Sequence, residues 1–242
     1  MPAPTQPAPL KRSPLSESLR SEGAVTQDYF GWEAVAHFGS PEDEARLIPR
    51  LIRGGVGLAD WSWLPKFEIQ GQNLDAAPPA TPPLPPSARA WRLARGRYLI
   101  TCSAADREAV ESQLARDSHP APARPSFYVT EVTSAHVALL LAGPRSTAVL
   151  RKLADLDLSD AAMPNHSCAR TGIAHVPATL LRDDFGGLPA YLLLCGREYG
   201  EWLWSTVSRA GEEFGMQPFG LSAREQLTRE PPARKPLSGA GT

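Results

Sequence analysis

The sequence predicts an α+β domain built on antiparallel sheets. Segments with helical spacing alternate with segments rich in strand formers, and several neighbouring strands are close enough to form hairpins. Apolar residues make up 42% of the 242 residues, which is enough to bury a substantial core. With 21% charged residues, this composition excludes a coiled coil, a collagen-like repeat and a wholly disordered chain.

The first third of the chain contains a well-marked helix. Ser40-Pro41-Glu42-Asp43 is typical of a helix start, because it combines a capping serine, a proline at the first helical position and acids in the first turn. We predict that this helix ends at Gly54-Gly55. The segment KFEIQG that follows at 66–71 alternates as a strand does, with Phe67 and Ile69 on one face.

The middle third is predicted as a hairpin, a helix and a strand. Residues 89–102 read as two strands that turn at Arg95-Gly96. Ser103 is placed to cap a helix that ends near Arg116. Residues 127–142 begin as a strand and end in an apolar run, and helical spacing follows over residues 145–156.

The last third continues the alternation. Residues 169–185 are expected to form two strands joined near Val176-Pro177, and Gly186-Gly187 then turns into the apolar strand AYLLLC. A helix from about Tyr199 to Phe214 and a short one over Leu221–Leu227 complete the pattern.

Proline defines the expected domain organisation. The chain has 25 prolines, and 16 of them gather in four clusters that disfavour helix and interior strand. We predict a disordered tail over residues 1–19, one folded domain over residues 20–228 and a second disordered tail over residues 229–242. Two Pro-rich insertions, at 76–88 and 119–126, are expected to connect folded elements.

Charge and targeting signals narrow the class of protein. The 25 basic residues are offset by 26 acidic ones, which argues against nucleic acid as a partner. Apolar runs stay well short of the roughly 20 residues of a membrane span, so no membrane partner is expected. The opening MPAPTQPAPLKR lacks the apolar core of a signal peptide, and we therefore expect a cytoplasmic protein.

Nucleophiles and metal ligands are sparse. Cys102, Cys168 and Cys195 are far apart and show no C-x-x-C, and the five histidines have no metal-ligand spacing, so no metal site is predicted. A nucleophilic pair of His166 and Cys168 is disfavoured, because nothing nearby supplies an oxyanion hole. We therefore predict no catalytic residue of this kind.

Two further patterns allow more than one interpretation. Asp183-Asp184 could hold a cation or act as paired acids, but neighbouring residues of a strand point to opposite faces, which favours a solvated strand end. Trp202 and Trp204 cannot both lie at the centre of one helical stripe. Either one packs inward with Leu203 and the other reaches a protein interface, or both belong to a layered core.

Several motifs together resemble one known family. GLADWSWLPKFEIQG at 57–71 is similar to the G-L-x-D-x-S-x-x-x-K-x-x-x-x-G segment of glycine-cleavage T-proteins, which are aminomethyltransferases. The strand, Gly-Pro turn and helix of that family resemble residues 139–153, and its later strands resemble residues 169–187. Its closing G-x-x-A-R-x-x-L segment is matched at residues 220–227. The resemblance covers residues 20–228 in the same order.

The resemblance implies a T-protein N-terminal-type folate-binding domain with antiparallel sheets and flanking helices. The family's C-terminal barrel is expected to be lacking, because the chain ends soon after Leu227. Asp60 and Arg224 occupy family-like positions and would form a vestigial folate site, with tetrahydrofolate as its ligand. Ordinary roles remain open for both: Asp60 as the cap of a turn before Trp61, and Arg224 in a surface ion pair.

The chain departs from the family where the acidic residues belong. The segment that matches G-G-x-x-D-D is 75–92, which has no Gly-Gly and no second acid. In the family, a T-G-E-x-G-x-E element carries the glutamate that hydrogen-bonds the pterin ring; here Leu188 and Leu192 stand at its two acid positions. Since leucine cannot accept N–H bonds, aminomethyltransferase activity is not expected and no catalytic residue is assigned.

A chain that has this domain without these acids resembles the gamma subunit of heterotetrameric sarcosine oxidase. RSPLSESL at 12–19 and YLLLCGREYGEWLW at 191–204 resemble that subunit. The resemblance implies a non-catalytic subunit that supports a flavin-dependent amine oxidase or demethylase in one-carbon metabolism. Larger flavoprotein subunits would carry FAD, FMN and NAD, and this chain would carry none of them. The alternative is a stand-alone T-protein-like folate-binding protein or aminomethyltransferase.

Overall fold

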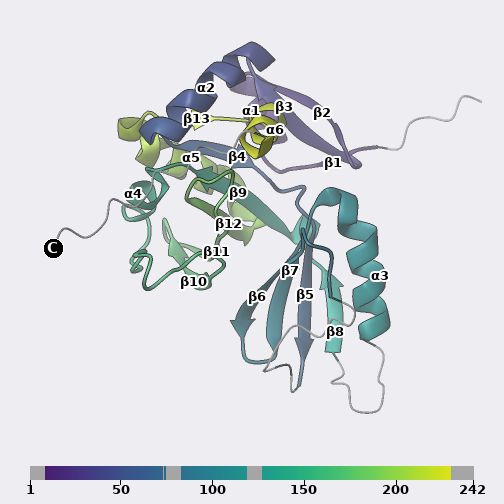
Figure 1. The fold of residues 1–242 in the computed structure, drawn as a ribbon. Helices are drawn as coiled ribbons and strands as arrows, with labels where there is room; N and C mark the ends of the chain where they lie inside the picture. The colour runs from purple at the N-terminus through teal and green to yellow at the C-terminus, as the bar shows by residue number, and fades with distance from the viewer. Residues whose placement is uncertain (1–8, 73, 75–82, 119–126, 230–242) are drawn as a thin grey trace, which may run out of the picture.

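The computed structural model describes residues 9–72, 74, 83–118 and 127–229, and these form three sheets with helices packed around them (Figure 1). The strands are β1 (Lys11–Arg12), β2 (Ala24–Tyr29), β3 (Trp32–Phe38), β4 (Gly57–Asp60), β5 (Lys66–Gly71), β6 (Arg89–Ala94), β7 (Arg97–Thr101), β8 (Phe127–Glu131), β9 (His136–Ala142), β10 (Cys168–Ile173), β11 (Val176–Arg182), β12 (Ala190–Gly196) and β13 (Gln217–Pro218). The α-helices are α1 (Ser16–Ser21), α2 (Pro41–Gly54), α3 (Arg107–Asp117), α4 (Ser146–Leu150), α5 (Gly200–Gly211) and α6 (Leu221–Arg229).

The largest sheet holds the core of the domain. Its strand order is β10-β11-β12-β9-β4-β13, and its neighbours are antiparallel except for the parallel pair β13–β4. Strand β9 is central: Leu140 lies opposite Leu192 of β12, and Leu141 lies opposite Leu58 of β4. Because β9 and β12 are buried on both faces, they are continuous apolar runs instead of alternating ones.

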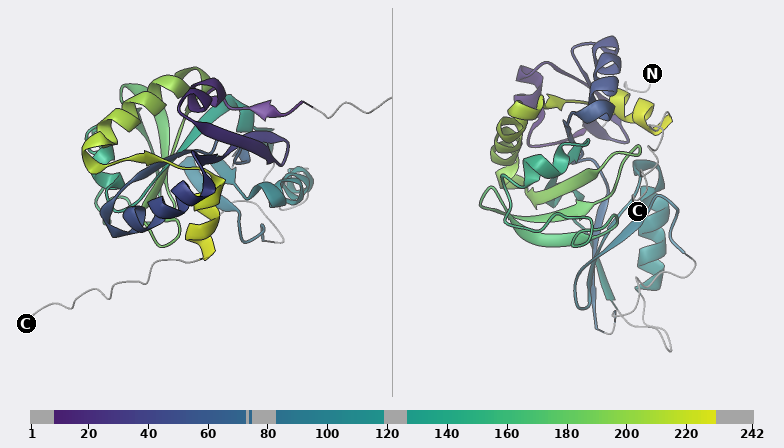
Figure 2. Two further views of the ribbon diagram at one scale, coloured as in Figure 1. Left: turned by 90° about the horizontal axis from the view of Figure 1, so that it is seen from above. Right: turned by 60° about the vertical axis from the view of Figure 1, so that its left-hand side comes forward.

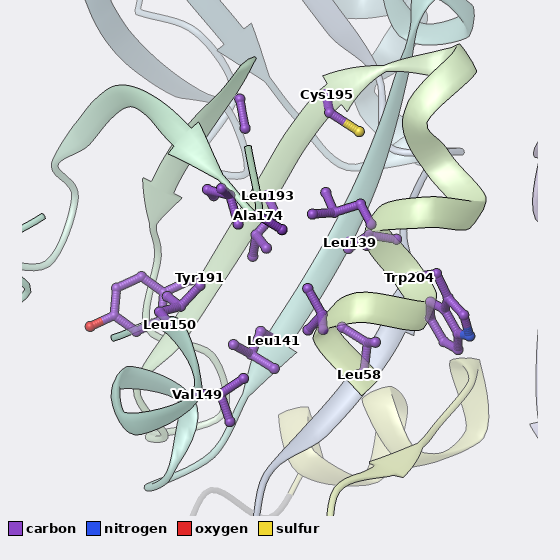
Figure 3. Close-up of a cluster of buried hydrophobic side chains, with 14 of the residues drawn as sticks. Leu58, Leu139, Leu141, Val149, Leu150, Ala174, Tyr191, Leu193, Cys195 and Trp204 are labelled. Atoms are coloured by element: carbon purple, nitrogen blue, oxygen red, sulfur yellow. The ribbon is translucent and has the colours of Figure 1, made fainter. Parts of the chain in front are cut away.

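One face of this sheet packs against α4 and α5. Figure 3 shows Leu58, Leu139, Leu141 and Leu193 pointing from the sheet toward those helices, where they form one buried cluster with Val149, Leu150 and Trp204. The opposite face carries Leu140, Leu181 and Leu192, which pack with Trp91 and Leu99 of the β6–β7 hairpin. The sheet therefore separates a closed core from a second layer made by another sheet.

The second sheet forms a lobe of its own with α3. Its strand order is β6-β7-β5-β8, and α3 lies along this sheet (Figures 1 and 2). Phe67 and Ile69 are buried on the same face of β5, as the alternation predicts, and they contact Val110 and Leu114 of α3 through one apolar cluster. The hairpin between β6 and β7 turns at Arg95-Gly96, which confirms the predicted turn.

The third sheet, β1-β3-β2, carries α2 and α6 beside it (Figure 2). The predicted start of α2 is confirmed in detail: the Ser40 hydroxyl accepts a hydrogen bond from the Asp43 N–H, and the Asp43 carboxylate accepts one from the Ser40 N–H. None of the helices in the described part of the chain is long and apolar enough to cross a membrane.

Three expectations are corrected by the structure. Residues 9–19 are ordered where a disordered tail over residues 1–19 was expected, because β1 pairs with β3 and Leu15 and Leu19 are fully buried; residues 1–8 lie outside the described part. The helix expected over 145–156 is α-helical only over Ser146–Leu150 and continues as turns. The β10–β11 turn lies at Ala174-His175, two residues before the predicted Val176-Pro177, since Val176 already pairs with Ile173.

The Pro-rich insertions fall mostly outside the described residues. Of the insertion predicted at 76–88, only residues 83–88 are described, and none of the insertion at 119–126 is. The tail predicted at 229–242 also lies outside, apart from the last residue of α6.

The two tryptophans of α5 take different positions, which agrees with the first of the two interpretations. Trp204 is 2% exposed, packs in the main core and donates its indole N–H to the Glu22 carboxylate at 3.2 Å. Trp202 is 57% exposed and donates its indole N–H to the Ala174 carbonyl at 3.4 Å.

We predict that Trp204→Ala lowers the free energy of unfolding by about 3–5 kcal/mol, because it leaves a cavity in the main core. The matched variant Trp202→Ala should cost about 1 kcal/mol or less, since most of that side chain is exposed. Urea unfolding followed by circular dichroism measures both. Equal losses for the two variants would contradict the assignment of Trp204 to the core.

Candidate functional site

A cavity of about 380 Å³ lies between the main sheet, the β6–β7 hairpin, the β11–β12 turn and α6. This volume is within the range of small-molecule sites. Its walls are aromatic and aliphatic, and polar groups converge from several elements. The lining includes Trp61, Trp91, Phe185, Leu140 and Leu192 among the apolar residues, and Ser87, Arg89, Thr101, Asp183, Asp184 and Arg224 among the polar ones.

Arg224 lies on α6 against two tryptophan rings. Its guanidinium carbon is 5.4 Å from the ring centroid of Trp61 and 5.4 Å from that of Trp63. One guanidinium nitrogen donates to the Tyr29 hydroxyl at 3.2 Å, while the buried Nε has no hydrogen-bond partner among the described residues. The structure therefore places the predicted Arg224 in the cavity wall, with no acidic partner within the described residues.

Glu44 of α2 positions α6, and therefore Arg224. Glu44 is buried, and its carboxylate accepts hydrogen bonds from the N–H groups of Gly220 at 2.6 Å and Ala223 at 2.9 Å, at the start of α6. It also accepts from the Phe38 N–H at 3.0 Å. Burial raises the pKa of Glu44, against the lowering effect of these three hydrogen bonds. From the sequence, Glu44 is only one of several acids in the first turn of a helix, and its contacts with α6 are not visible there.

Asp60 is used in the turn after β4. Its Oδ1 accepts hydrogen bonds from the Ser62 N–H at 2.9 Å and from the Ser62 hydroxyl at 2.5 Å. Asp60 is not among the residues that line the cavity, and burial raises the pKa of its carboxyl. This geometry is the turn cap that the sequence left open as the ordinary role of Asp60.

Lys66 is a buried cation beside this turn. It is fully buried, and its Nζ donates to the carbonyls of Ser62 at 3.0 Å and Leu64 at 2.7 Å. Burial lowers the pKa of Lys66 to about 7, against the opposing charges of Asp60 and Glu131. Lys66 joins β5 to the loop that carries Trp61, so it supports the cavity wall from behind.

Asp183 and Asp184 directly follow the end of β11 and keep solvent exposure, as expected, and they also line the cavity. Strand β11 ends at Arg182, so the two acids belong to the connection that follows and are not alternating strand residues. Gly186 and Gly187 close that connection with φ of 55° and 75°. A Cβ on Gly186 would lie 2.8 Å from the Leu227 carbonyl oxygen, so this turn packs against α6 only with glycine there.

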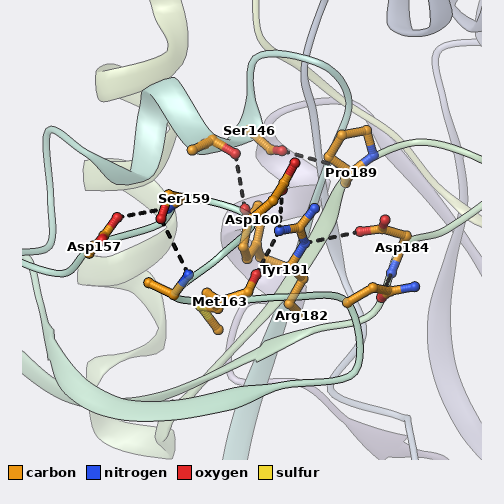
Figure 4. A network of polar contacts seen from close by, with 12 residues as sticks. Ser146, Asp157, Ser159, Asp160, Met163, Arg182, Asp184, Pro189 and Tyr191 are labelled. Atoms are coloured by element: carbon orange, nitrogen blue, oxygen red, sulfur yellow. Dashed lines mark hydrogen bonds and ion pairs between the residues drawn. The ribbon is translucent and has the colours of Figure 1, made fainter. Parts of the chain in front are cut away.

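The two acids have different partners. Asp183 Oδ1 lies 3.2 Å from His166 Nδ1 and 3.9 Å from Arg89 Nε. Burial raises the pKa of Asp183, and the charges of Arg89 and His166 oppose that shift. Asp184 instead accepts a hydrogen bond from Arg182 Nε at 3.3 Å, and Figure 4 shows it as part of the network around Arg182.

The two leucines at the family's acid positions are both buried. Leu188 packs with Leu51 and Leu227, and Leu192 lines the cavity from β12. Of the segment 75–92, which lacks the family's aspartate, residues 75–82 lie outside the described part.

Burial raises the pKa of the thiols near the site, which disfavours the thiolate form. Cys102 lines the cavity, but burial raises its pKa to about 12, which keeps it protonated. Cys168 lies 3.2 Å from the Arg92 carbonyl, and His166 contacts Asp183, so the structure does not form the pair of His166 and Cys168.

The sequence and the fold both match known proteins. Residues 88–234 match the family model described as the GCVT N-terminal domain, which is more than half of the chain. The chain belongs to the GCVT N-terminal domain family. This confirms the resemblance to glycine-cleavage T-proteins and the predicted α+β fold with antiparallel-rich sheets.

Curated relatives of the chain are aminomethyltransferases. The chain is 25% identical to that of Streptomyces coelicolor, over 91% of this chain and 62% of the relative, and 29% identical to that of Geobacillus thermodenitrificans, over 90% of this chain and 62% of the relative. The chain thus spans less than two thirds of the length of these relatives.

Two solved structures share the fold. One is the glycine cleavage system aminomethyltransferase T from Bartonella henselae, with a TM-score of 0.66 and 19% identity over 90% of this chain and 62% of that one. The other is a heterotetrameric sarcosine oxidase from Corynebacterium sp. U-96, with a TM-score of 0.53 and 17% identity, where the match covers 72% of this chain and 95% of that one.

We predict that the free energy of unfolding rises between about pH 7 and pH 8.5 through Lys66. In this range the unfolded chain keeps a proton on Lys66 that the folded chain releases, and stability increases with pH wherever the unfolded state binds more protons. Lys66→Met should remove this rise, which is at most about 1.4 kcal/mol per pH unit. Urea unfolding of both proteins at pH 7.0 and 8.5 measures the difference. Equal pH slopes would contradict a depressed pKa for Lys66.

Proposed function

We propose that this chain binds a reduced folate in the cavity, without aminomethyl transfer of its own. The observation that carries the proposal is the cavity itself: aromatic rings of Trp61, Trp91 and Phe185 border a space where carboxylates and guanidinium groups converge. A folate combines a planar heterocycle with hydrogen-bonding edges and an anionic tail, and such a lining offers groups for each part. Membership of the GCVT N-terminal domain family supports the same ligand class.

In this proposal, Arg224 is the cationic side chain that contacts the bound folate. Its guanidinium is held against Trp61 and Trp63, and its Nε still lacks a hydrogen-bond partner among the described residues. Asp60 stands behind the wall, where it holds the turn that carries Trp61. The segment 75–92 has no second acid where the family's G-G-x-x-D-D aspartate belongs, and this favours binding over aminomethyl transfer.

We predict that tetrahydrofolate binds the protein measurably by isothermal titration calorimetry, and that Arg224→Ala weakens binding roughly 10-fold or more through the loss of a charged donor. The matched variant Arg209→Ala, in an exposed arginine of α5 away from the cavity, should bind as the unaltered protein does. No heat of binding at millimolar tetrahydrofolate would overturn the proposal, and so would equal affinities for the two variants.

A second candidate function is that of a non-catalytic subunit of a flavin-dependent amine oxidase or demethylase. It is favoured by the exposed Trp202, because exposed tryptophan is enriched at protein interfaces. It is also supported by the match that covers 95% of a chain of heterotetrameric sarcosine oxidase. In that role, larger flavoprotein partners would hold FAD, FMN or NAD.

For this second function we predict that the tagged protein, purified mildly from its own cells, co-elutes with a large flavoprotein subunit and shows a flavin spectrum. Trp202→Ala should reduce the flavin absorbance that co-elutes. Tyr128→Ala, which alters an even more exposed aromatic residue on strand β8, should leave that absorbance unchanged. A colourless lone chain would contradict the subunit function and leave folate binding as the proposed activity.

A further inference from the structure

The β11–β12 connection brings a carboxylate into the cavity by a route that differs from the family pattern. Leu188, at the position where the family has an acid, is 3% exposed and packs with Leu51 and Leu227, so it offers a ligand no acceptor. Asp183 lies five residues earlier in the same connection and lines the cavity. The Gly186-Gly187 turn fixes this connection, since Phe185 and Leu188 exchange both backbone hydrogen bonds at 2.9 Å.

Asp183 is better placed than Asp184 to receive a ligand. The Asp184 carboxylate is held by Arg182 Nε at 3.3 Å, within the network of Figure 4. Among the described residues, both cationic contacts of Asp183 are made through Oδ1, and no partner of its Oδ2 is found there. Oδ1 is therefore held from the side of His166 and Arg89 but keeps a further lone pair, and Oδ2 is available, so the carboxylate can still accept two donors.

The groups behind Asp183 orient it and keep its charge compensated. His166 Nδ1 is 3.2 Å from Oδ1, and Arg89 Nε is 3.9 Å from it. Arg89 is fixed in turn, because its Nη1 donates to the carbonyls of Pro86 at 2.7 Å and Ala88 at 3.2 Å. The Nε of Arg89 has no hydrogen-bond partner among the described residues.

We propose that Asp183, oriented by His166 and Arg89, receives the N–H donor edge of the bound heterocycle and so determines which heterocycles the cavity accepts. The proposal rests on the proposed folate binding and adds the residue that selects the ring. A 2-amino-4-oxopyrimidine edge presents two adjacent N–H donors, and an ionised carboxylate is the side chain that accepts both. Heterocycles without that donor pair would leave Asp183 partly desolvated and unpaired, which disfavours them.

The test compares two isosteric variants, Asp183→Asn and Asp184→Asn, with the unaltered protein. The probes are tetrahydrofolate, its analogue without the 2-amino group, and p-aminobenzoylglutamate, which has the tail and no pterin ring. Calorimetric titration gives each affinity, and thermal melting shows that each variant is folded.

We expect Asp183→Asn to weaken tetrahydrofolate binding roughly 10- to 100-fold, with little effect on the other two probes, because only tetrahydrofolate uses both donors. Asp184→Asn should stay within about threefold of the unaltered protein for all three. The unaltered protein itself should prefer tetrahydrofolate over the analogue without the 2-amino group, and this comparison does not depend on the folding of any variant.

Two results would overturn the assignment while folate binding stands: tetrahydrofolate affinity in Asp183→Asn within about threefold of the unaltered protein, or equal losses for all three probes. An unaltered protein that does not discriminate against the analogue overturns it as well. If the unaltered protein binds no tetrahydrofolate at all, the proposed function fails together with this assignment. Binding by the unaltered protein therefore shows which of the two proposals has failed.

Discussion

The buried carboxylate of Glu44 is the interaction on which the site depends. It holds α6 against α2 and β3, because it accepts hydrogen bonds from the Phe38 N–H, six residues away in the sequence, and from the Gly220 and Ala223 N–H groups, 176 and 179 residues away. An uncapped helix start in this interior would leave several N–H groups without partners, at a cost of about 1–3 kcal/mol for each. With Glu44 in place, α6 is held where Arg224 reaches Trp61 and Trp63.

The cavity is built at the junction of the two larger sheets. The apolar face of the main sheet supplies its floor, and the β6–β7 hairpin supplies a wall through Trp91. Lys66, Asp60 and Ser62 hold the loop that carries Trp61, so a buried polar network lies directly behind an aromatic wall. Hydrogen-bonded buried networks of this kind restrict the geometry of the loop, and an ordered wall of aromatic rings suits a flat ligand.

The sequence and the structure point to different residues as the acids of the site. The resemblance sets Leu188 and Leu192 against two acids of the family, whereas Asp183 and Asp184 give the cavity two acids at another position. Both aspartates keep the solvent exposure that the sequence predicts for a strand end. They lie in the cavity because β11 ends at Arg182 and the glycine turn folds the following residues back onto α6.

The sequence by itself determined the local features of this protein: the capping box of α2, the turn at Arg95-Gly96 and the buried face of β5. Each follows from the periodicity or turn chemistry of a few neighbouring residues. Only the tertiary structure decided that Glu44 caps α6, that Arg224 stacks on tryptophan and that Asp183 meets His166 and Arg89. These contacts join residues far apart in the chain, and no local pattern encodes which distant groups will satisfy a buried charge.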